Sequence, residues 1–192
     1  MFGNYQRSSS LISISPHMIK HRTLGPHKNF IGGFPSQVFG LIKLRVLDLD
    51  KKLIKEIPSS GIVSPLSSSC LEELYLSYNK LTFIPNDFCQ QLQHVKHLWL
   101  SNSKIASPLR SGLGKMAKLK ELDLESIFFT GAIPSEMYSL ANLRTLQLHG
   151  NILTGTFSSS VFANDKLDNF GFGYELYFGR TSYGNWIVWS AV

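Results

Sequence analysis

Residues 128–155 read FFTGAIPSEMYSLANLRTLQLHGNILTG, and this stretch decides the fold because its apolar spacing returns along the chain. Within it, Leu143, Leu146 and Leu148 are the first, fourth and sixth residues of a recurring segment. The other segments with this spacing, the last of them degenerate, start at Leu44, Leu71, Val95, Leu119 and Leu167. From Leu71 onward, each start is the twenty-fourth residue after the previous one. A register held through five starts indicates an internal repeat of one structural unit.

The repeat is incomplete where it begins. Residues 30–44 match the second half of a later copy, but counting one full period back from Leu44 reaches Lys20, where nothing reads as a strand. The first unit is therefore expected to lack its strand half. The interval from Leu44 to Leu71 is longer than the later ones, and it contains the Ser/Pro-rich run at 59–69, which predicts a longer loop on the convex side.

The spacing LxxLxL describes a short strand whose fourth and sixth side chains point to the same face. A single coil cannot bury these leucines alone, so at least about three coils must stack. Position 9 is Asn in two copies, Asn79 and Asn151, whose amides can bond to backbone groups where the chain leaves the strand. Position 13 suits a turn with positive φ, and four copies carry glycine there: Gly32, Gly131, Gly155 and Gly179.

The segments LTFIP (81–85), FTGAIPSEMYSLANL (129–143) and NILTGTF (151–157) resemble the plant-type leucine-rich repeat, LxxLxLxxNxLTGxIPxxLxxLxx. The resemblance covers about residues 30 to 180. It implies an α/β-type solenoid, a horseshoe with short parallel strands on its concave face and irregular or 3-10 segments on its convex face. It also implies protein or peptide recognition without catalysis, as in receptor-like proteins and receptor kinase ectodomains.

These patterns divide the chain into three parts. Residues 1–28 are expected to form a poorly ordered lead-in, 29–180 a solenoid of about 6.5 repeats, and 181–192 an aromatic C-terminal cap or truncated repeat. The formal net charge is +6. The whole excess lies in residues 1–60, which hold nine Lys/Arg and three Asp/Glu. A solvated lead-in explains this excess, with an anionic surface or nucleic acid as the alternative.

Compartment and thiol state follow from composition. Residues 11–15 are too short for the apolar core of a secretory signal, and no run approaches the ~18 apolar residues of a membrane span. A complete chain would be cytoplasmic, whereas a fragment of a receptor-like protein would be extracellular or at the cell surface. Cys70 and Cys89 occupy different repeat positions, so free thiols are expected. The oligomeric state stays open.

The candidate binding site lies on the outward columns of the strands, at positions 2, 3, 5, 7 and 8. Two groups stand out there, an aromatic cluster on adjacent coils and an acidic patch on the next coil, Glu121, Asp123 and Glu125. Exposed aromatic side chains are common anchors of protein interfaces. The partner-binding residues predicted from these columns are Tyr75, Tyr78, His97, Trp99, Asp123, Glu125 and His149.

The charge and chemistry of these columns limit the classes of partner that can bind this face. Over six coils the outward columns hold five Lys/Arg and eight Asp/Glu, which argues against nucleic acid on this face and favours a basic or mixed protein or peptide. No cofactor, metal site or catalytic residue is predicted, because neither a nucleophile–base pair nor metal-spaced Cys and His residues accompany the three carboxylates. The alternative is carbohydrate or ice binding through aromatics or a threonine row, Thr82, Thr130 and Thr154, which Ala106 interrupts.

Overall fold

The structure is a computed structural model that describes part of the chain. The described residues are 23–24, 33–34, 41, 43–57, 70–85, 87–154, 164–172, 176–180 and 186–190. The predicted lead-in at 1–28 and the loop at 59–69 lie largely or wholly outside them. The three-part division of the chain therefore stays a prediction.

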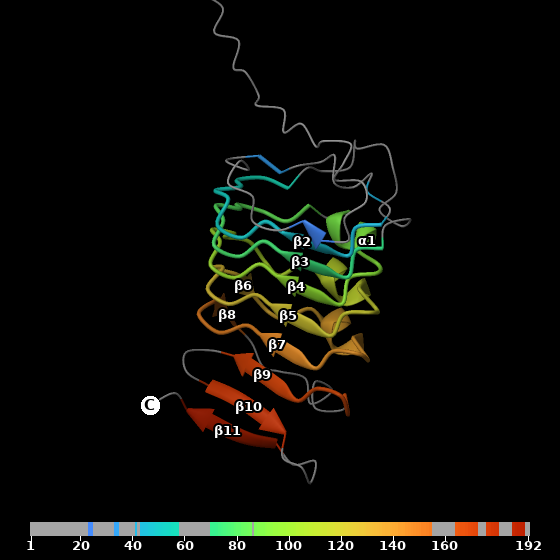
Figure 1. Ribbon diagram of the computed structural model, residues 1–192. Coiled ribbons are helices and arrows are strands. Elements are labelled where there is room, and N and C mark those ends of the chain that lie inside the picture. The colour runs from blue at the N-terminus through green and yellow to red at the C-terminus, as the bar shows by residue number, and fades with distance from the viewer. Residues whose placement is uncertain are drawn as a thin grey trace, which may run out of the picture.

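One sheet runs through the described coils, in the order β1-β2-β3-β4-β5-β7-β9-β10-β11. Neighbours from β1 to β9 are parallel, and β10 and β11 add to the far edge in antiparallel pairing. Figure 1 shows the strands stacked in chain order, with the C-terminus at one end. Their bounds are β1 Thr23–Leu24, β2 Val46–Asp48, β3 Glu73–Tyr75, β4 His97–Trp99, β5 Glu121–Asp123, β7 Thr145–Gln147, β9 Asn169–Phe172, β10 Leu176–Arg180 and β11 Trp186–Ser190.

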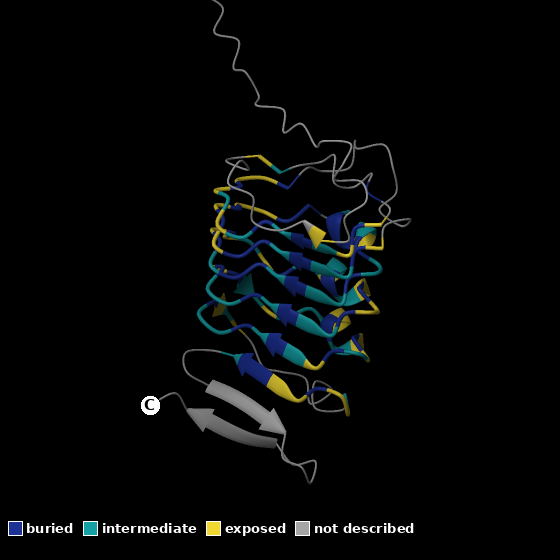
Figure 2. Cartoon of the chain, viewed as in Figure 1, coloured by how far each residue is buried: buried dark blue, intermediate teal, exposed yellow. Residues whose placement is uncertain are grey.

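The strand register lays the repeated leucines in columns through the core. Leu74 pairs with Leu98, which pairs with Leu122, and the row continues on both sides. From the coil at Leu44 to the coil at Leu143, residues at positions 1, 4 and 6 are all at most 3% exposed. Figure 2 shows the buried residues running along the middle of the strands from coil to coil. This confirms the predicted solenoid, since each coil buries its leucines against the next.

Short helices cover the convex side. They are α1 Phe88–Gln91, η4 Ser111–Lys115 and η5 Ser135–Ser139. Each contributes an apolar side chain to the same core, namely Phe88, Leu113 and Met137. The helices are only about a turn long. A proline precedes each of them (Pro85, Pro108 and Pro134), and Gly112 and Gly114 lie within η4. The convex face therefore has the helical and irregular character that the repeat predicted.

A second, two-stranded parallel sheet forms where the chain leaves the first sheet. It contains β6 Thr130–Gly131 and β8 Ile152–Leu153, and a bridge from Pro108 to Thr130 extends it by one coil. Gly131 has φ 73°, as the glycine pattern predicted for position 13. Gly32 and Gly155 lie outside the described residues.

Buried asparagines join consecutive coils at position 9. The Asn79 side chain donates to the carbonyls of Leu49 and Leu76, and its oxygen accepts the N–H groups of Lys52 and Ile54. Asn151 repeats this arrangement farther along the stack. The amide therefore satisfies backbone groups that the strand leaves unpaired, as predicted from sequence.

The described structure corrects two expectations at the ends of the stack. A strand does precede Leu44, because Thr23 pairs with Val46 and Leu24 with Leu47. The interval there is one position shorter than the repeat period, so a strict count back from Leu44 misses it. At the other end Gly179 lies inside β10 and not in a turn, because the chain reverses after β9 and pairs antiparallel. The aromatic cap predicted for 181–192 depends on side chains outside the described part of the structure, so it stays a prediction.

Candidate binding site on the concave sheet face

The concave face consists of the side chains at positions 3, 5, 7 and 8 of each coil. The strands β2, β3, β4, β5 and β7 are each three residues long, with a buried leucine between two half-buried residues. The alternation follows from the two-residue period of a strand. Positions 3 and 5 are therefore presented to solvent by an otherwise buried scaffold.

Three aromatic rings form a stack in the middle of this face. The ring centroids of Tyr75 and Trp99 lie 4.3 Å apart with planes 2° from parallel. His97, two residues before Trp99 on β4, stacks on that indole at 5.5 Å. Strand pairing causes the contact of Tyr75 with Trp99, because the two are register partners on neighbouring strands.

The tyrosine of the stack is held by a neighbouring carboxylate. The Tyr75 hydroxyl donates to Glu73 Oε2 at 3.0 Å. Burial raises the pKa of the Tyr75 hydroxyl to about 12, and the hydrogen bond to Glu73 acts in the same direction. The phenol therefore stays neutral at physiological pH and offers an apolar ring with a fixed polar tip.

Tyr78 lies apart from this stack, at the rim of the face. Its side chain is 54% exposed, and its backbone is left-handed, with φ 57°. Lys51 of the preceding coil places its ammonium 5.2 Å from the ring centroid. The same left-handed φ recurs at position 8 of the other coils, at Lys51, Asn102, Ser126 and Gly150. The turn geometry, and not only the side chain, therefore directs Tyr78 away from Tyr75.

The acidic strand β5 engages histidines on both neighbouring coils. His97 Nδ1 lies 3.1 Å from Glu121 Oε2, and His149 Nε2 lies 3.0 Å from Glu125 Oε1. Between these two glutamates, Asp123 accepts the backbone N–H of Glu125. The predicted residues Glu125 and His149 therefore form one pair, and Asp123 sits beside Trp99 as its register partner.

Two more carboxylates extend the face on the other side of the stack. Asp48 and Asp50 belong to the coil before Tyr75, and Asp50 accepts the N–H of Ser77 at 2.7 Å. Burial raises the pKa of Asp50, although the bond from Ser77 opposes that shift. Sequence reasoning did not select these aspartates for the site, but their positions 5 and 7 are those of Asp123 and Glu125, and this was the available signal.

The charges on the face are segregated by column. In the five coils from Leu44 to Leu143, positions 3, 5 and 7 hold no Lys or Arg and six carboxylates: Asp48, Asp50, Glu73, Glu121, Asp123 and Glu125. Basic side chains gather instead at position 2, where Arg45 and Lys96 both pair with Glu72. Those partners, Lys96 first, lower the pKa of Glu72. The floor of the face is thus anionic, and a partly neutralised basic ridge borders it.

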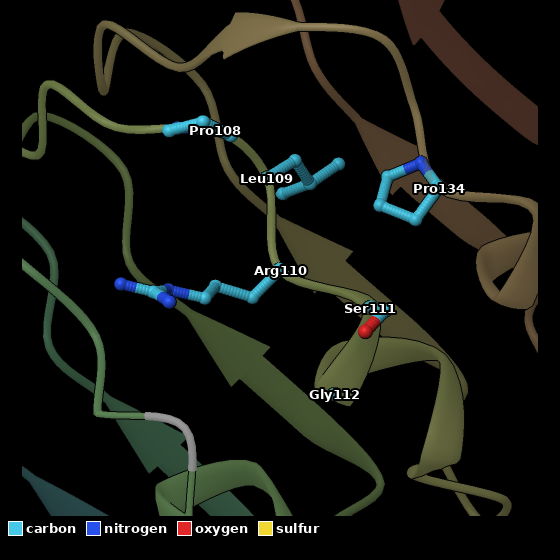
Figure 3. A pocket seen from close by; sticks show the side chains of 6 residues that line it. All are labelled: Pro108, Leu109, Arg110, Ser111, Gly112 and Pro134. Atoms are coloured by element: carbon cyan, nitrogen blue, oxygen red, sulfur yellow. The ribbon is translucent and has the colours of Figure 1, made fainter.

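Other candidate sites are weaker. Within the described part of the chain, no group of three or more His, Cys, Asp or Glu residues is arranged to hold a metal ion. A pocket of about 360 Å³ lies away from the sheet, lined by Pro108–Gly112 and Pro134. In Figure 3, Leu109 extends toward Pro134, whereas Arg110 extends to the opposite side. The lining combines apolar side chains with Arg110 and Ser111, and we assign no function to this pocket.

Two further observations concern thiols and membranes. Cys70 is exposed and Cys89 is buried, and both are free, as expected from their repeat positions. Burial raises the pKa of the Cys89 thiol to about 12. Among the described residues, no helix has the length and apolar character needed to cross a membrane.

Comparisons with known proteins agree with the fold. A leucine rich repeat family model matches residues 69–127. A probable serine/threonine-protein kinase of Dictyostelium discoideum, pats1, is 30% identical over 112 residues, which are 58% of this chain and 4% of that protein. The match lies in the repeat region of this chain and covers only a small share of the kinase. The activity of the kinase is therefore not evidence for the activity of this chain.

Solved structures with a similar fold also contain leucine-rich repeats. One match is a chain from the Arabidopsis receptor kinase HAESA in complex with the peptide hormone IDA and the co-receptor SERK1, with TM-score 0.68, 25% identity, and 76% of this chain and 25% of that chain covered. The plant peptide hormone receptor RGFR1 in complex with RGF2 matches with TM-score 0.62 and 28% identity, and the match covers 71% of this chain and 22% of that chain. The Leptospira interrogans LRR protein LIC12759 matches with TM-score 0.66 and 29% identity, and the match covers 81% of this chain and 38% of that chain.

The chain therefore spans a minor part of each of these structures. Three observations nevertheless agree on the class of fold: the matched family model, the constant register of the parallel strands, and the solved structures. The described coils form a leucine-rich repeat solenoid that resembles the ectodomains of plant receptor kinases.

Proposed function

We propose that the chain is a non-catalytic scaffold that binds a protein or peptide on its concave sheet face, through Tyr75, Tyr78, His97, Trp99, Asp123, Glu125 and His149. The observation that carries this proposal is the stack of Tyr75 and Trp99 in the middle of an open sheet face. Two large half-buried rings on adjacent strands supply apolar area at low cost in side-chain entropy, which suits an interface anchor.

The solved structures support the class of partner. HAESA and RGFR1 are described as bound to peptide hormones, and the leucine-rich repeat is what this chain shares with them. The acidic side chains on and just after β5 are held in place on this face. Glu121 and Glu125 are each paired with a histidine, and Asp123 accepts a backbone N–H. Nucleic acid is a poor partner for a face whose inner columns are anionic.

Selection from a random peptide display library tests the proposal. Peptides enriched on the wild-type protein should lose at least about thirtyfold in affinity for Tyr75→Ala/Trp99→Ala, the effect of losing one anchor residue. The matched control is Phe83→Ala, which removes an exposed aromatic ring that lies outside the concave sheet. Equal loss in the control, or unchanged binding in a folded double variant, would reject the concave face as the site.

A further inference from the structure

We infer that the occupant of the concave face is an extended peptide carrying two cationic side chains, arginine or lysine, four residues apart. This inference rests on the proposed function and adds the chemistry of the partner. It follows from the placement of charge on the face, the strand spacing, and the ring stack between the charges.

The carboxylates at positions 5 and 7 fall into two clusters, whereas Glu73, at position 3 between them, accepts the Tyr75 hydroxyl. The first contains Asp48 and Asp50 on one side of the stack, and the second contains Asp123 and Glu125 on the other. No Lys or Arg occupies the inner columns of the coils that separate them. Like charges held on one surface favour a partner of opposite charge, because that partner relieves their mutual repulsion.

The carboxylates keep the capacity to bind such a partner. Asp48 and Asp123 each accept one backbone N–H, from Asp50 and Glu125 respectively. An ionised carboxylate has about four acceptor positions, so each retains room for a guanidinium or an ammonium group. Those backbone bonds also fix the side chains, which lowers the entropy lost when a cation binds.

The spacing of the clusters sets the spacing of the cations. Asp48, Tyr75, Trp99 and Asp123 occupy position 5 of four consecutive strands, paired in register. Three steps of about 4.8 Å between neighbouring strands place Asp48 and Asp123 about 14 Å apart. An extended chain that crosses the strands advances about 3.4 Å per residue, so residues i and i+4 span the same distance.

The ring stack lies between the two cationic contacts. Residue i+2 of such a peptide would lie over Tyr75 and Trp99, whose parallel rings form one continuous platform. A flat or aliphatic side chain at i+2 gains contact area there. A guanidinium at i+2 gains a cation–π interaction as well. The face therefore selects a spaced pair of cations and tolerates several residues between them.

Two peptides of identical composition test the spacing. The first, GRGSGRG, has its arginines four residues apart, and the second, GGRRSGG, has them adjacent; both are N-acetylated and C-amidated. Fluorescence anisotropy of labelled copies with the wild-type protein should show at least about fivefold tighter binding of the spaced peptide, because the adjacent pair reaches one cluster only. Equal affinity would overturn the inference, since both peptides carry the same charge.

Charge-neutral variants locate the effect. Asp48→Asn/Asp123→Asn keeps the backbone bonds and should abolish the preference for the spaced peptide. The charge-matched control is Glu56→Gln/Glu136→Gln, two exposed carboxylates outside the concave face, and it should retain the preference. If both variants lose the preference equally, net charge and not the face is responsible, and the inference fails. If the aspartate variant keeps the preference, the two aspartates do not cause it, and the inference fails as well.

The library selection separates this inference from the proposed function. Peptides that bind the wild-type face, lose affinity in Tyr75→Ala/Trp99→Ala and carry no spaced cations would overturn the inference and leave the proposed function intact. Enrichment of sequences with Arg or Lys at i and i+4 would support both. Enrichment of peptides that bind Tyr75→Ala/Trp99→Ala as tightly as the wild-type protein would reject both the proposed function and the inference.

Discussion

Replacing Asn79 with leucine removes the hydrogen bonds that join consecutive coils without opening a cavity, because the two side chains are similar in size. Asn79 is 5% exposed, and its side chain makes four backbone hydrogen bonds of 3.1 Å or shorter, with Leu49, Leu76, Lys52 and Ile54. At about 1 kcal/mol for each hydrogen bond, the substitution should lower the free energy of unfolding by about 4 kcal/mol. Domains of this size are typically stable by about 5–15 kcal/mol, so the loss is a large share of the total.

Urea denaturation followed by circular dichroism measures this loss. Asn142→Leu is the control, because the Asn142 amide donates to Ala117 in an exposed setting where water can replace it. The control should change stability by no more than about 0.5 kcal/mol. Amide exchange gives a second reading, since the N–H of Ile54 should lose its protection in Asn79→Leu. A cost no larger than that of a single hydrogen bond, about 1 kcal/mol, with Ile54 still protected would refute the role assigned to the asparagine.

Three further predictions follow from the structure. Gly114→Ala should cost about 2–3 kcal/mol in the same urea assay, since a Cβ would collide with the Glu136 backbone, whereas Gly33→Ala has open space and should cost little. A thiol reagent at pH 8 should modify Cys70 alone in the native protein and both cysteines in urea, because burial and a pKa of about 12 protect Cys89; rapid native modification of both would contradict this. Folding raises the pKa of Asp50, so ionising this carboxylate lowers the free energy of unfolding above the folded-state pKa and has no effect below the unfolded-state pKa. Asp50→Asn should therefore stabilise the protein at pH 7, and this gain in stability should vanish at pH 3. A gain that grows on acidification would contradict the prediction.

The sequence predicted the parallel sheet because the leucine spacing is itself the physical cause of the sheet. Leu74, Leu98 and Leu122 must meet in the core for any coil to be stable, and this forces the register of their strands. The same logic fails where the apolar code is weak. Residues 23–24 pair with β2, and no LxxLxL pattern announces them. Beyond β9 the chain reverses direction, and side-chain periodicity carries no information about that reversal.

The sequence predicted which side chains share the concave face but not how they are arranged on it. Columns 3 and 5 placed Tyr75, His97 and Trp99 together, and the structure stacks all three rings. Tyr78 belongs to the same predicted cluster because it occupies an outward column of the same coil as Tyr75, yet it lies at the rim beside Lys51. Its direction depends on a left-handed backbone at position 8, which follows from the turn and not from the residue type. The histidine–glutamate pairs depend on rotamers, which a column pattern does not encode.

The residues that stabilise the fold and the residues proposed for recognition alternate along the same strand. In β4 the buried Leu98 stabilises the stack, while His97 and Trp99 on either side project from it. Truncating a side chain such as Trp99 therefore removes contact area from the face without opening the core, whereas truncating Leu98 would leave a cavity costing about 2–5 kcal/mol. This separation is what makes binding experiments on the face interpretable. A folded variant of Tyr75 or Trp99 that no longer captures a peptide reports on recognition, because the leucine columns that hold the solenoid together are untouched.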